Sequence, residues 1–336
     1  MKFLGRIVRY VGAAIAIAGL IISIKACSTP PTQTPSTSAP SATTANSPKQ
    51  PININTAILS ELDKLEAALG VPALSHKIQA SRPYGSPADL VSKNVLSQAQ
   101  FDQVKNWVTV EEIELTGAAK DIDYMTKLGL MKGHMLVAQE LLALNKPDQA
   151  EPHLGHPVEE IYVDLEEQLQ ERTVPEFKAD LLAVQDLVKS KPNDPQIAAK
   201  FEAAMQKIDG AIAVLPETQR QSPAFVLQVI NGLLETASAE YTAAIANGKI
   251  KEAIEYQDSR GFVTYAQDTL WQGIAPAIQK TDVAAAQQMT TTFTALRQAW
   301  PAPVPPAAPV LSADEVAAKV KQVEMTSAPV LKAAAS

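Results

Sequence analysis

The sequence is short of several residue types on which structure or catalysis often depends. Among 336 residues there is one cysteine, and aromatic residues make up only 5%. A single cysteine excludes disulfides within the chain and thiolate metal clusters, and the shortage of aromatic residues, with no alternating apolar run, argues against β-strands. The common nucleophile, phosphate-loop, dinucleotide and zinc-protease motifs are missing as well. We therefore expect a protein that is not an enzyme, and the sequence identifies no small-molecule substrate.

Helical patterns fill most of the chain. Ser222 caps one clear helix, Pro223 occupies its first turn and a glycine ends it. A capping-box pattern at Thr173 and Glu176 precedes another helix. Apolar residues recur at helical spacing along both segments. The sequence therefore predicts an all-α fold, with a larger antiparallel helical bundle over residues 111–300.

The remainder, residues 301–336, is expected to lie outside that bundle. Five of the nine residues from Pro301 to Pro309 are proline, and proline cannot continue a helix interior. Ser312 with Glu315 forms a capping pattern for one last short helix. We expect a proline-rich tail with a short helix.

Residues 1–27 have the features of an export signal. A basic start without acids precedes an uncharged apolar run at residues 11–24, which is short for a bilayer span. The segment Ile24-Lys25-Ala26-Cys27 resembles a bacterial lipobox, which implies lipidation of Cys27. An uncleaved signal anchor and ordinary cleavage remain open. All three alternatives export the rest of the chain, and the first two anchor it to the membrane on the periplasmic side.

The next segment, residues 28–50, is mostly Ser, Thr and Pro, and Lys49 is its only charge. Such a composition has too little apolar surface to offset the entropy cost of ordering. We expect a disordered linker. Beyond it the chain is acidic, as the net charge of −7 for the whole sequence indicates, so bulk electrostatics does not draw it to polyanions.

Residues 51–110 are predicted to form a small module of short helices, separated by turns at glycine and proline. Several of its residues resemble the helix-hairpin-helix domain of ComEA-type DNA-uptake proteins, namely Asn53-Ile54-Asn55-Thr56-Ala57, Glu61-Leu62, Arg82-Pro83-Tyr84, Ser86 and Asp89-Leu90. The run from Pro72 to Leu90 is also similar to PsbU, the extrinsic subunit of photosystem II. The two relatives share one fold and differ in partner.

The ComEA resemblance implies binding of double-stranded DNA at the cell envelope. The binding residues that it implies are those of the first hairpin and the nearby basic side chains: Gly70, Val71, Lys77, Arg82, Lys93 and Lys105. The PsbU resemblance implies instead a structural protein that docks onto a membrane protein complex. It also implies a cyanobacterial source, in which the thylakoid lumen is an alternative to the periplasm.

The hairpin residues do not decide between these partners. A DNA-binding hairpin directs backbone N–H groups at a phosphate, but Pro72 has no N–H to donate, and the second hairpin at residues 94–97 has no glycine. The module from Pro51 to Thr109 carries five basic and five acidic residues, and a neutral surface attracts DNA weakly. DNA binding and protein docking both remain open.

A third hypothesis comes from the histidines, three of which fall close together in the sequence. His153, His156 and Glu159 follow one another at three-residue spacing, and their side chains are ligand types suited to Zn or Fe. Gly155-His156 with Glu159 also resembles the Gly-x-His-x-x-Glu of imelysin-like and EfeO-like helical proteins. Pro157 favours a different role for this segment, as the start of a helix. The sequence thus offers a metal-binding helical protein as a further alternative.

Two more polar features fall on predicted helices. His134 lies beside an apolar stripe, where a hydrogen-bonded histidine at the edge of the core is typical, and it is the fourth candidate metal ligand. Tyr256, Asp258 and Arg260 form a compact polar cluster inside a helix. For this cluster we predict an internal ion pair that reaches across the bundle.

Overall fold

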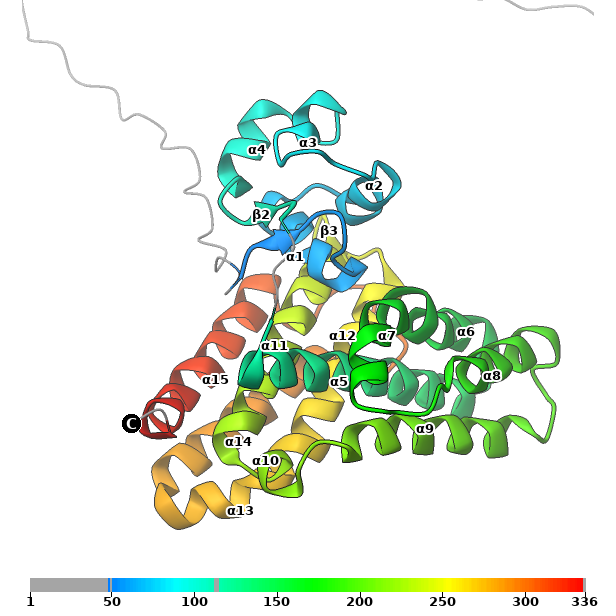
Figure 1. Cartoon of the computed structure of the whole chain (residues 1–336), viewed down its shortest axis with the longest axis vertical. Coiled ribbons are helices and arrows are strands. Elements are labelled where there is room, and N and C mark those ends of the chain that lie inside the picture. Colours follow the sequence, from blue (N-terminus) through cyan, green and yellow to red (C-terminus); the bar gives the residue numbers. More distant parts are fainter. Residues whose placement is uncertain (1–47, 49, 112–114, 335–336) are drawn as a thin grey trace, which may run out of the picture. The chain divides into compact units, whose positions relative to one another are not determined.

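A computed structural model describes residue 48, residues 50–111 and residues 115–334 (Figure 1). The predicted export segment, including Cys27, and nearly all of the predicted linker at residues 28–50 lie outside these residues. The described part is all-α, as predicted, because each of its strands has only two residues. No helix within it has both the length and the apolar character needed to cross a membrane.

Residues 51–110 form a module with its own apolar core. Strands β1 (Ile52–Asn53) and β2 (Val108–Thr109) pair in parallel and hold the two ends of the module together. Its helices are α1 (Leu59–Leu69), α2 (Leu74–Ala80), α3 (Asp89–Ser92) and α4 (Gln98–Val104). In α1, Leu62 and Leu65 are buried in this core, and Leu59 and Leu69 pack against its edge.

The bundle follows. Its first half contains α5 (Gly117–Ala143), α6 (Pro147–His156), η1 (Pro157–Tyr162), α7 (Val163–Glu171), α8 (Lys178–Ser190) and α9 (Ile197–Ala213). Its second half contains α10 (Glu217–Arg220), α11 (Pro223–Ala243), β3 (Ile245–Ala246), β4 (Lys249–Ile250), α12 (Ala253–Thr264), η2 (Tyr265–Trp271), α13 (Gln272–Thr281), α14 (Val283–Leu296), η3 (Arg297–Ala299) and α15 (Ala313–Ala334). Helices α5, α11 and α12 pack against one another at its centre (Figure 1).

The start of α8 differs from the capping box predicted at Thr173 and Glu176. Thr173 has a φ of 55° and its N–H donates to the carbonyl of Gln170, so it ends α7. The left-handed conformation that terminates one helix is incompatible with the extended backbone of a helix N-cap. Helix α8 therefore begins later, at Lys178.

Pro157 does not begin a helix, as its position had suggested. The chain runs without a break from α6 through η1, which is a π-helical segment, into α7. A proline inside a helix has no N–H for the preceding turn, and its ring displaces a carbonyl of that turn. The wider turn of a π-helix accommodates such a local disruption. His153, His156 and Glu160 consequently lie along one continuous helical segment.

The C-terminal tail was predicted to be separate from the bundle, and this boundary is corrected. Ser312 and Glu315 do form the predicted capping box, but the helix that they start, α15, has 22 residues and packs against α11 and α14. Val316 and Val323 on one face of α15 are buried in the bundle core. The apolar face of α15 makes this helix part of the bundle. The prolines that precede it led to the prediction of a separate tail.

Helices α5 and α12 cross with their backbones in contact at Gly133 and Gly261. A Cβ added at Gly261 would overlap the carbonyl oxygen of Gly133, and one added at Gly133 would lie 2.5 Å from the ring of Phe262. Only glycine at both positions permits this approach. The crossing lies next to His134 on α5 and close to Asp258 on α12, and it therefore brings these two side chains within reach of each other.

We expect Gly261→Ala to lower the free energy of unfolding by about 2–3 kcal/mol, because the two helices must separate to admit the methyl group. Urea denaturation followed by circular dichroism measures this. Gly210→Ala is the matched control, since nothing lies within 4 Å of its added Cβ, and alanine there is expected to stabilise α9 by up to about 1 kcal/mol. Equal stability of the two variants would show that the crossing tolerates a side chain.

Candidate metal centre

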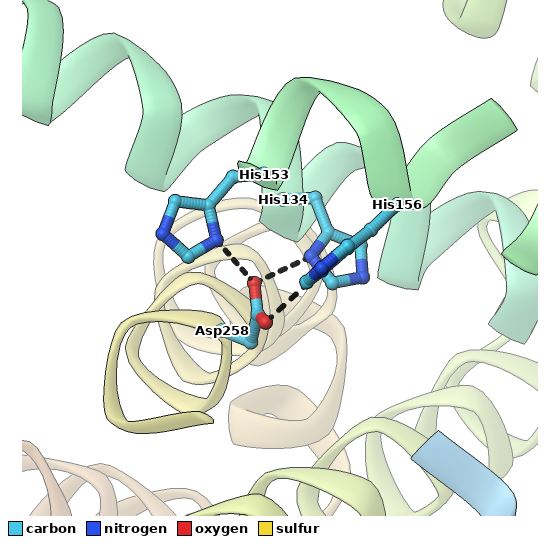
Figure 2. A group of neighbouring side chains, drawn as sticks. All are labelled: His134, His153, His156 and Asp258. Carbon is cyan, nitrogen blue, oxygen red and sulfur yellow. Dashed lines mark hydrogen bonds and ion pairs between the residues drawn. The ribbon is translucent and has the colours of Figure 1, made fainter. Parts of the chain in front are cut away.

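Four side chains from three helical segments meet at the centre of the bundle. His134 comes from α5, His153 and His156 from α6, and Asp258 from α12. In Figure 2 the three imidazole rings surround the carboxylate of Asp258. His134, His153 and Asp258 are 1%, 0% and 3% exposed, whereas the side chain of His156 is 20% exposed. The group is therefore enclosed on all sides except at His156.

The distances within the group suit metal coordination. The Nδ1 atoms of His134 and His153 lie 2.6 and 2.7 Å from Oδ1 of Asp258, and Nδ1 of His156 lies 3.2 Å from Oδ2. The four ligand atoms all lie within 4.8 Å of one another. In a tetrahedral site with bonds of about 2.0–2.2 Å, neighbouring ligand atoms are about 3.4 Å apart. Small rotations of the four side chains would bring them to such an arrangement.

The protonation of His153 is fixed by its neighbour Gln257. The amide nitrogen of Gln257 donates to Oε1 of Gln149 at 3.0 Å and to the carbonyl of Pro303 at 3.2 Å. Its amide oxygen therefore faces Nε2 of His153, 2.9 Å away, and that nitrogen must donate. The Nδ1 atom of His153 then faces the Asp258 carboxylate, 2.7 Å from Oδ1. Two lone pairs at this distance repel each other, and a metal ion bound by both atoms would remove that repulsion.

Burial and mutual attraction shift the pKa values of the group in opposite directions. Burial opposes ionisation of Asp258, but the three imidazoles outweigh it and hold the pKa of this carboxyl well below its usual range. Burial lowers the pKa of His134 despite the nearby carboxylate. His156 is also desolvated, but Asp258 and Glu160 raise its pKa to about 10. The imidazolium of His156 and the carboxylate of Asp258 thus stabilise each other's charges.

More carboxyl groups surround the centre on the side of His156. Oε1 of Glu160 lies 3.8 Å from Nε2 of His156. Burial, reinforced by other carboxylates, raises the pKa of Glu160 and of Glu255 to about 7. Asp63 of α1 and Glu240 of α11 are buried too, and burial together with repulsion from neighbouring carboxylates raises both pKa values well above the usual range. The centre therefore lies beside a group of buried acids.

Two further side chains of α12 hold this helix, which carries Asp258, in place. The Nε and Nη2 atoms of Arg260 donate to the two oxygens of the Glu140 carboxylate, at 2.7 and 2.8 Å, and Nη1 donates to the carbonyl of Trp300. This is the ion pair across the bundle that the polar cluster predicted. Tyr256 donates to the carbonyl of Ala302, so the chain after α14 is fastened to the helix that carries Asp258.

Of the four metal ligands proposed from the sequence, the structure brings three together and leaves one out. His134, His153 and His156 converge, but Glu159 is exposed and is not part of the group. On this helical segment the residue four positions after His156, Glu160, faces back toward it instead. Sequence reasoning missed Asp258 as a ligand, although an acid inside a long buried stretch of helix was the available signal.

The residues proposed to bind DNA make hydrogen bonds and packing contacts within the module instead. The carboxylate of Glu66 accepts the N–H groups of Ala73 and Ser75 after the first hairpin, so an internal anion already occupies these donors. Gly70 has a φ of 61° and ends α1, while Val71 packs against the module core. The backbone N–H groups of Ala73 and Ser75 are therefore not free to bind a phosphate.

The basic side chains near the hairpin are similarly engaged. Arg82 donates to the carbonyls of Ile54 and Ala57, Lys93 donates to those of Ser81 and Pro83, and Lys105 pairs with Asp102 at 3.4 Å. Lys77 on α2 is exposed, as are Lys93 and Lys105. These lysine and arginine contacts are mostly structural.

Comparison with protein families matches residues 216–334 to the iron permease-associated 4-helix bundle domain. The match covers α10 to α15 and thus includes Asp258 and the C-terminal helix that the sequence had placed in a tail. No curated protein and no solved structure matches the chain. The iron permease-associated match overturns the ComEA and PsbU identification, and with it helix-hairpin-helix DNA binding.

We expect Glu240→Gln to stabilise the metal-free protein at pH 7. Because the pKa of Glu240 is higher in the folded than in the unfolded chain, its ionisation penalises folding once the pH exceeds the unfolded value. The amide removes this penalty, which is worth at least about 1 kcal/mol for a shift of one pKa unit. The gain should shrink as the pH falls toward 4.

Urea denaturation with a chelator present measures this difference. Glu166→Gln, at an exposed position of α7, is the control and should change stability by less than about 0.5 kcal/mol. A Glu240→Gln protein that is less stable than the wild type at pH 7 would mean that the carboxylate has a stabilising partner.

Proposed function

We propose that the protein is an exported, membrane-anchored metal-binding protein that holds a divalent transition-metal ion, iron(II) first among them, for an iron permease of the same membrane. The observation that carries this proposal is the buried group of three histidines and one aspartate, whose four ligand atoms lie within 4.8 Å of one another. The ion is cargo in this proposal, and the bundle is the part of the chain that holds it.

The donor set favours this class of ion. Imidazole nitrogens suit Zn, Cu, Fe and Ni, while a carboxylate adds a harder oxygen ligand that Fe(II) and Zn accept. One carboxylate and three neutral imidazoles leave a bound divalent ion with a net charge of about +1, which the nearby carboxylates of Glu160 and Glu255 can offset. The hydrogen bond from Nε2 of His153 to Gln257 is the kind of outer contact that orients a ligating histidine.

The family match supports the choice of iron and of the partner. The matched domain is described as iron permease-associated, and the matched residues 216–334 supply Asp258 to the centre. The N-terminal segment supports the location, since its basic start and apolar run are typical of export. An exported protein tethered at its N-terminus would stay near a permease in the same membrane.

Purified full-length protein is expected to bind one equivalent of Fe2+ under anaerobic conditions. His153→Ala and Asp258→Ala should each weaken binding by at least about 100-fold, because each removes a ligand and leaves other buried polar groups unpaired. Equilibrium dialysis with iron analysis measures both, and circular dichroism checks that the variants fold.

His76→Ala is the control for this experiment, since His76 is the one remaining histidine and is exposed on α2. It should bind iron like the wild type. If all histidine variants bind equally, or if the wild type retains no ion, the centre does not bind metal.

In cells, loss of the protein should reduce the uptake of radiolabelled iron when external iron is scarce. The wild-type gene should restore uptake and a gene for Asp258→Ala should not, although both proteins reach the same level on immunoblots. Full restoration by Asp258→Ala would show that the protein's role in iron uptake does not depend on this centre.

A further inference from the structure

A pocket of about 820 Å³ lies among the helices of the bundle. Helices α5, α9, α11 and α13 and the segment η2 line it, together with Arg220 and Gln221 at the end of α10. None of the four proposed metal ligands is among its lining residues. Sites for small organic molecules have volumes of about 300–1,000 Å³. The pocket therefore has the size of a ligand site and is distinct from the proposed metal centre.

Apolar side chains form much of the pocket wall. Helices α5, α9 and α13 contribute methionine, leucine and isoleucine, namely Met125, Leu136, Met205, Ile212 and Ile274. Methionine is flexible and polarisable, so it adapts to apolar groups of different shape. A hydrocarbon chain placed against these side chains leaves water, which is favourable. The walls therefore suit the apolar part of a ligand.

The charged groups of the pocket are mainly positive, whereas the whole chain has a net charge of −7. Lys132, Arg220 and Lys280 line the pocket together with one acid, Asp209. Nε of Arg220 donates to the carbonyl of Leu215 at 2.9 Å. Within the described part of the chain, no carboxylate pairs with Arg220 or Lys280. Because cations without carboxylate partners attract anions, the pocket suits a ligand that is negatively charged as well as apolar.

Two almost fully buried side chains of the pocket have hydrogen-bond donors to spare. Lys132 is 8% exposed, and Asp209, 2.6 Å from its Nζ, is the one acceptor that reaches it among the described residues. An ammonium group has three donors. Tyr265 is 3% exposed, and its hydroxyl makes no hydrogen bond to a described residue. Buried donors normally have partners, so these two are available to oxygen atoms of a ligand.

We infer that this pocket binds a single-chain anionic lipid, that is, a molecule with one hydrocarbon chain and a carboxylate or phosphate head. The chain lies against the methionine, leucine and isoleucine side chains. The head pairs with Lys132, Arg220 and Lys280 and accepts a hydrogen bond from Tyr265, and charge makes these contacts stronger than neutral ones. This binding activity is additional to the proposed binding of metal and does not depend on it.

The charge of the pocket argues against the chain's own N-terminal segment as the occupant. The apolar run at residues 11–24 follows a start that is basic and contains no acid. The cations of the pocket would repel that start, whereas they attract the head of an anionic lipid.

Photolabelling of the full-length protein in phosphatidylcholine vesicles tests the inference. Photoactivatable hexadecanoic acid should label peptides of α9 and α13 in a saturable manner, as mass spectrometry detects. Unlabelled hexadecanoate and hexadecyl phosphate should compete, and the better competitor identifies the head group. Hexadecanol has the same chain without the charge and should compete at least about tenfold more weakly. Equal competition by hexadecanol, or labelling outside the pocket alone, would overturn the inference.

Gly273→Leu is a variant that fills the pocket without disturbing the core. Gly273 is an exposed residue of α13 that lines the pocket, and nothing lies within 4 Å of an added Cβ. The leucine should reduce labelling at least about tenfold, because it takes space that the ligand needs. Gly210→Leu is the matched control, since Gly210 is equally open and exposed on α9 but does not line the pocket. Equal labelling of the two variants, both folded by circular dichroism, would show that the ligand lies elsewhere.

Lys280→Gln tests the charge of the pocket. It should weaken labelling about two- to fivefold, as the loss of an exposed ion pair does. Lys207→Gln, at an exposed position of α9 outside the pocket, removes the same charge and should be labelled like the wild type. Equal labelling of the two lysine variants would remove the anionic head from the inference and thereby overturn it.

A benzophenone side chain introduced at Gln221, an exposed residue of the pocket rim, reports the occupant directly. On illumination it should form an adduct with added hexadecanoic acid. Crosslinks to residues 1–27 of the same chain, or to a second copy of the chain, would mean that protein fills the pocket and would refute lipid binding.

Discussion

The arrangement of the bundle depends on one buried carboxylate shared by three imidazoles. Asp258 is removed from water, a position that an isolated carboxylate occupies only at large cost. His134 and His153 contact one of its oxygens and His156 the other. Because these partners come from two helices packed on α12, the charge of Asp258 fixes the places of α5 and α6 relative to it. The interior of the bundle is therefore organised by electrostatics as well as by apolar burial.

Hydrogen bonds from the residues on either side of Asp258 also hold α12 to other parts of the bundle. Gln257 links His153 to Pro303, and Arg260 links Glu140 to Trp300. The segment after α14, where five prolines prevent regular structure, is thus held by side chains that flank Asp258. The same segment leads into α15, whose apolar face closes the bundle. One helix consequently connects the centre to the C-terminal third of the chain.

Much of this fold is present in the sequence as local pattern. Apolar periodicity predicts α1 and most of α11, and a capping box predicts the start of α15, because these signals act within a few residues. The end of α11 was wrong, since the helix stops at Ala243 and the glycine expected to end it, Gly248, lies in the turn between β3 and β4. The three histidines were predicted as a group because two of them lie on one short helix and the third is nearby in the sequence. Local signals also explain the errors. A proline suggested a helix start at residue 157, where tertiary packing carries the helix through a π turn.

Asp258, the ligand that the sequence did not reveal, shows why the rest of the site could not be predicted. Asp258 is 105 residues from His153 in the chain, and the two meet only because α5 and α12 cross and α6 packs on α5. Spacing along a regular helix selected Glu159 in its place. The resemblance of the module to DNA-binding hairpins likewise rested on short motifs, and it did not reveal that Glu66 occupies the hairpin N–H groups. Long-range contacts of this kind leave no local pattern.

The contact between Gly133 and Gly261 also limits how α5 and α12 can adjust to each other. Two helices whose backbones touch cannot approach further, and no side chain lies between them at this point to repack. In the metal-binding function that we propose, a change of coordination geometry would therefore come from rotation of the His134 and Asp258 side chains, and not from movement of one helix against the other. The two glycines thus confine adaptation at the centre to its side chains.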